Sequence, residues 1–239
     1  MTYPLGGRGV VEYSRITGEL FAASPSGSNF LSSSSSNFSF GSTDFAFNFW
    51  FKINDTSADQ YILSKSLNTG NQRSYFIAFD TANKRITWKI SRNGIATYEV
   101  TSSTVVLQDT WYMCSVFKDF SNEILGISIS NGTITTTPTS DPTLFTSSQD
   151  FEIGRINAGG IFGDIEMDSL SVYNKIFTQP LISTLHNSGN GVTYDDQDKV
   201  GMQNHYKMNE ETGARVDFHG SDDLTDNSSV SRSIGKILD

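Results

Sequence analysis

The sequence is poor in cysteine and in basic residues, and both shortages exclude classes of protein. Its single cysteine, Cys114, rules out a disulfide within the chain, and its place in the strand-like run WYMCSVF predicts a small buried core residue. With 17 Lys and Arg against 26 Asp and Glu, the net charge is −9, which disfavours binding to nucleic-acid phosphates or to an anionic membrane surface. We therefore expect no nucleic acid among the partners. The acidity suits solubility, cation binding or a place on an assembly surface.

Long apolar runs and the common cofactor motifs are also missing. No stretch approaches the ~20 apolar residues of a membrane span, and the N-terminal MTYPLGGRGVVEYS lacks the apolar region of a secretory signal peptide. We therefore expect synthesis in a cytoplasm and no membrane insertion. The sequence contains no CxxC, HExxH or glycine-rich phosphate loop, so structural zinc and nucleotide binding have no support.

What the chain has instead is a series of alternating apolar segments. In DFAFNFWFKI, every second residue from Phe45 to Ile53 is large and apolar, which predicts a strand with one apolar face. Such a face needs a second sheet to cover it, so a sandwich is expected. Further strands are predicted at residues 60–65, 74–80, 85–90, 95–100, 110–118, 124–130, 151–155 and 167–174.

Two Asn-Gly pairs, Asn93-Gly94 and Asn131-Gly132, stand between alternating runs. Both central positions of a type I′ turn need a positive φ, so these pairs predict two β-hairpins with such turns. Strands repeating every ~8–12 residues and joined by tight turns favour an antiparallel sandwich over parallel βαβ units.

One short helix is predicted near the end of the strand-rich region. Thr178 can cap it, Pro180 suits its first turn, its apolar stripe ends at Leu185, and Gly189 can stop it. We expect it to pack on an edge of the sandwich, where it covers unpaired strand groups. The Gly- and Ser-rich residues 1–41 predict an exposed irregular connection.

Six motifs follow one another in the order of a known family. They are NFWFKI, ILSKS, DTWYMCSVFKD, ISNG, EIGR and GDIEMDSLSVYNKIFT. Together with the short helix and LHNSGNG that follow, matches that run from about residue 30 to 191 resemble the laminin G-like branch of the concanavalin A-like jelly rolls. The resemblance implies an all-β fold, an antiparallel two-sheet jelly-roll sandwich with one short helix.

The C-terminal part resembles a narrower group. LHNSGNGVTYDD followed by HYKMNEETGARVDFHGSDDLTDN is similar to laminin G-like modules of phage tail, fibre and capsid-associated proteins. There the second segment forms the first strand of the module, whereas here it stands last, and FAASPSGSNFL (21–31) fits the module's second strand. We therefore expect residues 1–191 to form the jelly-roll core and residues 192–239 to supply an edge strand. That strand either closes its own sandwich or is exchanged with a neighbouring copy, and a disordered remnant of a tandem array is the third alternative.

The family also contains retaining β-glucanases, which carry an ExDxxE motif. GDIEMDSLS supplies Glu166 and Asp168, but residues 169–171 provide no third acid, so a proton donor is missing. We therefore predict no enzymatic activity, and a role for Asp168 in holding a loop in place. None of the 3 histidines lies in a nucleophile-elbow context, which disfavours a hydrolytic triad.

Clustered carboxylates make calcium the one cofactor to consider. Hard cations bind such oxygen clusters, although no EF-hand spacing is present. Solvated acidic loops with local Asx turns are the alternative. The candidate ligands are Asp195, Asp196, Asp198, Asp222 and Asp223.

Aromatic residues on the predicted strands make a glycan the second ligand to consider. Trp50, Trp88 and Tyr98 are the candidates for an aromatic platform that stacks on sugars. Trp88 and Tyr98 flank the Asn93-Gly94 turn, and cross-strand register would place them near each other on one face. The alternative is that these rings belong to the core.

Together these features predict a non-enzymatic structural or adhesion protein of a bacteriophage virion, as a capsid decoration, head-fibre or tail-associated protein. Its partners would be other virion proteins, copies of itself, or a host-surface glycan. A free lectin-like carbohydrate-binding domain is the alternative, and a glycoside hydrolase of the same fold is the third.

Overall fold

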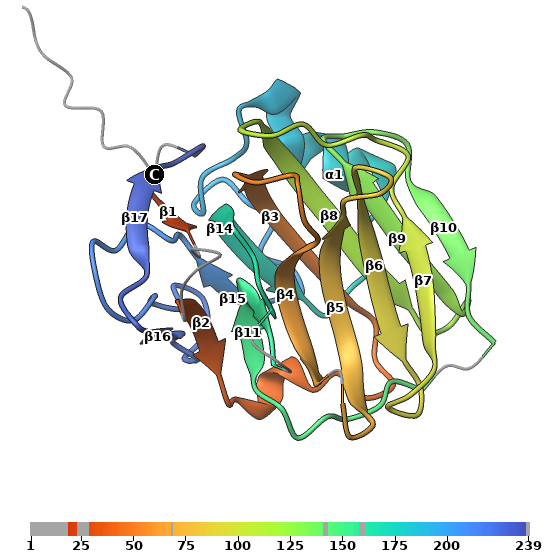
Figure 1. The fold of residues 1–239 in the computed structure, drawn as a ribbon. Helices are drawn as coiled ribbons and strands as arrows, with labels where there is room; N and C mark the ends of the chain where they lie inside the picture. Colours follow the sequence, from red (N-terminus) through yellow and green to blue (C-terminus); the bar gives the residue numbers. More distant parts are fainter. Residues whose placement is uncertain (1–18, 23–28, 68, 141–142, 158–160, 238–239) are drawn as a thin grey trace, which may run out of the picture.

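The computed structural model describes residues 19–22, 29–67, 69–140, 143–157 and 161–237. In these residues two antiparallel β-sheets face each other across a shared core, and one short α-helix lies outside them (Figure 1). The predicted two-sheet jelly-roll sandwich with one short helix is confirmed. Cys114 is a buried core residue, as predicted, and burial raises the pKa of its thiol well above the ordinary range. No helix in the described ranges is long and apolar enough to cross a membrane.

Each sheet combines strands from distant parts of the chain, as in other jelly rolls. The first has eight strands: β10 (Thr135–Pro138), β9 (Ile124–Ile129), β8 (Trp111–Asp119), β3 (Phe45–Ile53), β14 (Ile165–Tyr173), β1 (Glu19–Ala22) and β17 (Ser231–Ile234) in spatial order, with β15 (Met202–Tyr206) also paired to β14. The second has seven: β16 (Thr225–Asn227), β2 (Phe30–Ser33), β11 (Phe151–Ile153), β4 (Gln60–Leu67), β5 (Gln72–Asp80), β6 (Arg85–Ser91) and β7 (Thr97–Thr101). A small hairpin of β12 (Arg155–Ile156) and β13 (Ile161–Phe162) lies against β4.

Strand β3 shows how the sandwich is held together. Its predicted apolar face is fully buried, and Phe45 and Phe47 contact Tyr75 and Trp88 of the facing sheet at ring-centroid separations of 5.6–6.2 Å. Burying each such side chain stabilises the fold by about 1.5–3 kcal/mol. On the opposite face of β3, Ala46, Asn48 and Trp50 are buried as well, because other elements cover most of the outside of the eight-stranded sheet.

Helix α1 (Gln179–His186) is the main element of that cover. Ile182 and Leu185 pack with Trp50, Met113 and Tyr173, which come from three strands of the eight-stranded sheet. The prediction that the helix packs on a sandwich edge is therefore wrong, since it lies on the outer face of the sheet. The physical reason is a second apolar cluster, which an edge position would leave exposed to water.

The two ends of helix α1 differ in how well they were predicted. The helix begins after Thr178, although the Thr178 hydroxyl makes no capping hydrogen bond. It ends at Asn187, whose φ is 46°, and not at Gly189. Asn tolerates this left-handed conformation because its side chain bonds the local backbone, and here the Asn187 amide donates to the Gly191 carbonyl at 2.8 Å. Gly189 lies in η2 (Asn187–Gly189), the 3-10 turn that follows.

Both predicted hairpins form, but the turn between β6 and β7 is of another kind. Gly94 has a φ of 81°, whereas Asn93 is not left-handed, so the pair is not a type I′ turn. Instead the Asn93 side-chain oxygen accepts from the backbone N–H groups of Ile95 and Ala96, at 3.0 and 2.9 Å. This local bond stabilises a longer loop, as Asx residues often do.

The turn between β9 and β10 lies one residue earlier than predicted. Its left-handed residues are Ser130 (φ 47°) and Asn131 (φ 60°), and the Gly132 N–H donates to the Ile129 carbonyl at 2.9 Å. The two central residues are thus Ser-Asn, although Asn-Gly was predicted to fill them. The register of the two strands fixes the turn more strongly than the preference of Gly for a positive φ.

Within the predicted irregular connection of residues 1–41, the described part from residue 29 onward is more ordered than expected. Strand β2 occupies residues 30–33, and η1 (Ser36–Phe38) places the Phe38 ring against Phe151 with 4.1 Å between centroids. Burial of this aromatic pair explains why a serine-rich segment is held to the sandwich. The predicted strand over residues 21–31 lies partly outside the described residues.

The C-terminal segment pairs with the rest of the same chain. Strand β15 pairs with β14, β16 with β2, and β17 with β1, so both sheets contain strands from this segment (Figure 1). Tyr206 and Leu224 are fully buried in the core. The boundary at residue 191 and an exchange between copies remain predictions.

Asp168 ties the end of this segment to the sheet. One of its carboxylate oxygens accepts from the backbone N–H groups of Lys236 and Ile237, at 2.7 Å each, and the Ile237 side chain is buried beside Trp50. The prediction that Asp168 holds a loop in place is confirmed.

Candidate functional site

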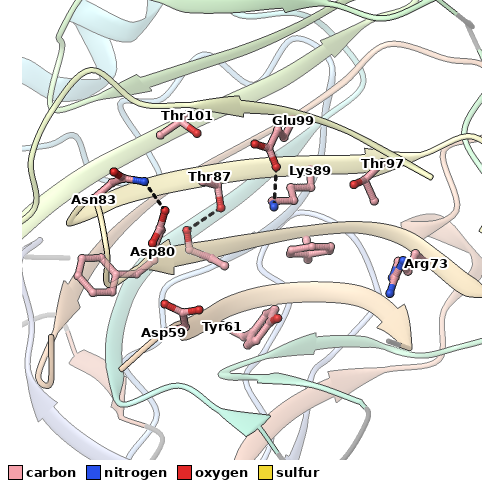
Figure 2. Close-up of a pocket in the computed structure, with 13 residues that line it drawn as sticks. Asp59, Tyr61, Arg73, Asp80, Asn83, Thr87, Lys89, Thr97, Glu99 and Thr101 are labelled. Atoms are coloured by element: carbon pink, nitrogen blue, oxygen red, sulfur yellow. Dashed lines mark hydrogen bonds and ion pairs between the residues drawn. The ribbon is translucent and has the colours of Figure 1, made fainter. Parts of the chain in front are cut away.

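A depression of about 480 Å³ lies on the outward face of the seven-stranded sheet, over β4 to β7 (Figure 2). Side chains alternate along a strand, so Trp88 and Ile90 of β6 enter the core while Thr87 and Lys89 point outward into the depression. Its lining residues are mostly polar or charged: Asp59, Tyr61, Arg73, Phe76, Ala78, Phe79, Asp80, Asn83, Thr87, Lys89, Thr97, Glu99 and Thr101.

An aromatic pair forms one part of the depression. The rings of Tyr61 (β4) and Phe76 (β5) are 5.7 Å apart and tilted by 53°, and both side chains are half-buried. Burial raises the pKa of the Tyr61 hydroxyl, so it remains a hydrogen-bond donor at neutral pH. The pair offers an apolar surface bordered by a polar group.

Gly163 fixes the strand that carries Tyr61. A Cβ at this position would lie 2.4 Å from the Tyr61 carbonyl oxygen, so only glycine lets the end of the β12–β13 hairpin approach β4 this closely. The Gly163 N–H also donates to the Gly154 carbonyl at 2.8 Å. The hairpin therefore holds this side of the depression in place.

An ion pair stands beside the aromatic rings. Lys89 (β6) and Glu99 (β7) are directly opposite each other in the strand register, with 2.5 Å between their charged atoms. The Lys89 ammonium also lies 5.9 Å from the centre of the Phe76 ring. Both side chains are partly exposed, so the pair can donate and accept hydrogen bonds from a ligand.

Two carboxylates, Asp59 and Asp80, line the end of the depression that lies away from Arg73 (Figure 2). Asp80 accepts from the Asn83 side chain at 2.7 Å and from the Ala82 backbone at 2.8 Å, and the Asn83 bond lowers the pKa of Asp80. Asp59 accepts from the Thr81 backbone N–H at 2.9 Å. These bonds hold two negative charges at fixed positions.

Trp88 and Tyr98 share one face of the seven-stranded sheet, as predicted, but that face points into the core, and Trp50 belongs to the other sheet. Trp88 is 0% exposed, and its indole N–H donates to the Phe117 carbonyl at 3.3 Å. Trp50 is 3% exposed and stacks with His186 of helix α1, with 5.6 Å between ring centroids. Tyr98 shares the core-facing side of the sheet with Trp88 and packs against the core. None of the three lines the depression.

Phe76 was missed, although its sequence position carries a signal. In SYFIAFD the core residues are Tyr75, Ile77 and Phe79, so Phe76 is a large aromatic residue on the polar side of the alternation. An aromatic residue at that position is poorly explained by the core. Tyr61 gave no comparable signal, because β4 has a register irregularity beside it that blurs the alternation.

The carboxylates of the predicted first calcium loop have separate partners. Asp198 binds Lys175 at 2.7 Å, and Asp195 lies 3.9 Å from Lys199. Asp196 accepts from the hydroxyl of the threonine three residues before it, at 3.0 Å. The three carboxylates are exposed and do not converge.

The two carboxylates of the second predicted calcium loop, Asp222 and Asp223, accept hydrogen bonds that stabilise the fold. Asp222 accepts from the side-chain amides of Asn37 and Asn204, at 2.6 and 3.1 Å, and Asp223 accepts from the Asp217 backbone N–H at 2.9 Å. Across the part of the chain that the structure describes, no group of three or more His, Cys, Asp or Glu side chains is placed to hold a metal ion.

The carboxylates of the incomplete glucanase motif are engaged by neighbouring groups. Glu166 pairs with Lys52 at 2.9 Å and accepts from the Ser233 hydroxyl at 2.7 Å. Asp168 is fully buried and bonds the backbone of the C-terminal segment. A sugar has no access to the Asp168 carboxylate in this arrangement.

A Ser–His pair is present in the interior. The Ser171 hydroxyl and the His205 Nδ1 are 2.8 Å apart, but both side chains are fully buried. The pair therefore has no surface at which a substrate could bind, and it acts as a polar link between β14 and β15.

Comparison with known proteins identifies relatives of this fold. The family model described as the concanavalin A-like lectin/glucanases superfamily matches residues 25–183. No curated protein matches the chain significantly in sequence.

Solved structures resemble most of the chain. A Bacteroides ovatus protein described as a candidate carbohydrate-binding protein has a TM-score of 0.67 at 14% identity, over 92% of this chain and 60% of its own length. The heptameric SAP-like pentraxin of Limulus polyphemus has a TM-score of 0.64 at 12% identity, over 93% of this chain and 98% of its own.

A third structure was solved with a sugar bound. The CBM40 of the Ruminococcus gnavus IT-sialidase, bound to α2,3-sialyllactose, has a TM-score of 0.52 at 13% identity, over 65% of this chain and 91% of its own. At such identities the likeness to solved structures shows a shared fold and leaves the ligand to be argued from the residues.

Proposed function

Because this chain belongs to the concanavalin A-like lectin/glucanases superfamily, we propose that it is a non-enzymatic carbohydrate-binding protein. Its ligand would lie in the depression over β4 to β7. The observation that carries the proposal is the half-buried Tyr61–Phe76 ring pair beside the partly exposed Lys89–Glu99 ion pair. Two of the structural relatives, described as carbohydrate-binding or solved with sialyllactose, support the same class of ligand.

The chemistry of a sugar matches these side chains. The C–H face of a pyranose ring is apolar and can pack on Phe76 and Tyr61, while its hydroxyl groups need donors and acceptors. Lys89 can donate to one hydroxyl and Glu99 can accept from another, and charged partners make such bonds stronger. The side chains stand on paired strands, so little conformational freedom is lost on binding.

The absence of hydrolysis is part of the proposal. Asp168 bonds the C-terminal backbone, and the third acid of the glucanase motif is missing. We expect no release of reducing sugar from β-glucans by the protein or by an Asp168→Asn variant. Release by the natural protein that the variant lacks would contradict a purely binding role.

The glycan-binding proposal is tested by a glycan array with matched variants. We expect Phe76→Ala to weaken binding roughly tenfold, which corresponds to ~1.4 kcal/mol. Phe218→Ala is the control, because Phe218 is 44% exposed and lies outside the depression. A flat array for the natural protein, or equal loss in both variants, would refute the proposal.

We also propose, as a setting for this binding, that the protein is an adhesion component of a phage particle. The support is the resemblance of residues 185–196 and 205–227 to modules of tail, fibre and capsid-associated proteins, and this part of the chain supplies strands to both sheets. Partners would then include other particle proteins or copies of this chain. Its presence in purified particles at a fixed copy number is the expected result, and its absence would remove this setting while leaving carbohydrate binding intact.

A further inference from the structure

We propose that the ligand of the depression over β4 to β7 is an uncharged glycan chain, and that acidic glycans are selected against. This inference rests on the proposed carbohydrate-binding function and concerns the class of sugar. It is carried by the number, the positions and the existing partners of the charged side chains in the depression.

Negative charge predominates among the lining residues. The three carboxylates are Asp59, Asp80 and Glu99, and the two cations are Arg73 and Lys89. The whole chain adds to this imbalance with a net charge of −9. An anionic sugar approaching the depression is therefore repelled both by the protein as a whole and by the local carboxylates.

Both cations already bond protein groups. Lys89 lies 2.5 Å from Glu99, so a ligand carboxylate at Lys89 would also face the carboxylate of Glu99. The Arg73 guanidinium donates to the Ile95 carbonyl at 2.8 Å, at the end of the depression away from Asp59 and Asp80 (Figure 2). Strong recognition of a carboxylate or sulfate normally uses a bidentate Arg or an unopposed cation. Only Arg73 stands away from the carboxylates, and part of its guanidinium is already used by the Ile95 carbonyl, so one partly engaged cation faces three carboxylates.

The same groups suit a neutral sugar. Paired Lys and Glu side chains present a donor and an acceptor close together, which matches two neighbouring hydroxyl groups of one pyranose. The hydroxyls of Thr97 and Thr101 on β7 add further polar contacts without charge. Asp80 is held as an acceptor by its bonds to residues 82 and 83.

The depression is also long enough for more than one sugar. Tyr61, Phe76, Lys89 and Glu99 come from four successive strands, β4 to β7. Neighbouring strands are ~4.8 Å apart, so the three intervals span about 14 Å, which exceeds a single pyranose ring. The site therefore fits a chain of sugars that crosses the strands.

The test compares neutral and acidic probes on the full chain. The neutral probes are cellohexaose, xylohexaose, mannohexaose and laminarihexaose, and the acidic probes are hexagalacturonate and 3′-sialyllactose, all measured by calorimetry. We expect at least one neutral hexasaccharide to bind roughly tenfold or more tightly than either acidic probe. Its monosaccharide should bind at least tenfold more weakly than the hexasaccharide.

A charge variant makes the test specific to this face. In Asp59→Asn/Glu99→Gln two carboxylates become amides, and we expect the preference for the neutral over the acidic probe to fall roughly tenfold. The control is Asp195→Asn/Asp196→Asn, which removes the same charge from exposed residues outside the depression and should leave the preference unchanged.

The outcomes separate the two proposals. Tighter binding of an acidic probe by the natural protein, or an equal shift in the control variant, overturns the inference while carbohydrate binding stands. Binding of no probe, or binding that Phe76→Ala does not weaken, overturns the proposed function and the inference with it.

Discussion

His205 is a titratable side chain that lies entirely inside the fold. It is fully buried, its Nδ1 bonds the Ser171 hydroxyl, and its ring stacks on Tyr194 with 4.8 Å between centroids. Its Nε2 is buried with no hydrogen-bond partner in the part of the chain that the structure describes. Burial, assisted by the nearby Lys207, lowers the pKa of His205 from 6.5 to about 3.

This shift predicts a loss of stability in mild acid. The folded pKa of His205 lies below the unfolded value, so its contribution is complete above pH 6.5 and is lost as the pH falls toward about 3. We expect the free energy of unfolding to drop by up to ~2 kcal/mol between about pH 6.5 and about pH 5, measured by urea denaturation. Burial also lowers the pKa of His186 and raises those of Glu152 and Asp164, so a matched variant is needed to assign the effect to His205.

The matched variant for this prediction is His205→Gln, which keeps a polar side chain without the titrating ring. Its unfolding free energy should fall clearly less over the same window than that of the natural protein, with the remaining slope due to groups such as His186. A slope equal to that of the natural protein would assign the acid sensitivity to other groups.

At the scale of elements, the C-terminal segment holds both sheets together. It adds β15, β16 and β17, and its buried side chains Tyr206, Leu224, Val230 and Ile237 enter the two apolar clusters. Deleting residues 204–239 would expose these clusters and leave strand edges unpaired. We expect the truncated protein to lose solubility or to associate, as seen by light scattering. Unchanged stability and assembly would refute both own-chain closure and exchange.

Asp168 allows a milder test of the same attachment. Asp168→Ala removes the acceptor of the Lys236 and Ile237 N–H groups, and unsatisfied buried donors cost about 1–3 kcal/mol each. We expect faster hydrogen exchange over residues 231–237 and a lower urea midpoint. Asp195→Asn, at an exposed carboxylate, is the control. Equal exchange rates in both variants would show that this bond does not hold the segment.

The elements themselves were largely predictable from the sequence, because alternation over β3, β5 and β6 follows from the two faces of a strand. Details that depend on contacts with other elements could not be predicted from the sequence. The turn at Ser130-Asn131 is set by strand register, and helix α1 lies on a sheet face because Trp50 and Met113 need cover. Alternation also does not say whether an aromatic residue faces the core or a ligand, which is why Trp88 was proposed for the site and Phe76 was not.

For the whole molecule, the candidate ligand face and the paired strands β1 and β17 lie on different parts of the sandwich. The depression covers β4 to β7, whereas β1 and β17 pair at the far edge of the other sheet (Figure 1). A protein attached through the β1–β17 edge would leave the depression accessible. This geometry suits an adhesive role, in which a rigid β scaffold presents a sugar-binding surface.

The central claim is that a glycan binds on the outward face of β4 to β7. It is tested most directly by titrating the isotope-labelled full chain with neutral hexasaccharides and following backbone amide shifts by NMR. We predict that the shifts cluster at Tyr61, Phe76, Lys89 and Glu99, while Phe218 and its neighbours stay unchanged. Shifts confined to the loops around residues 195–200 or 217–222, or no shifts with any glycan, would contradict the account.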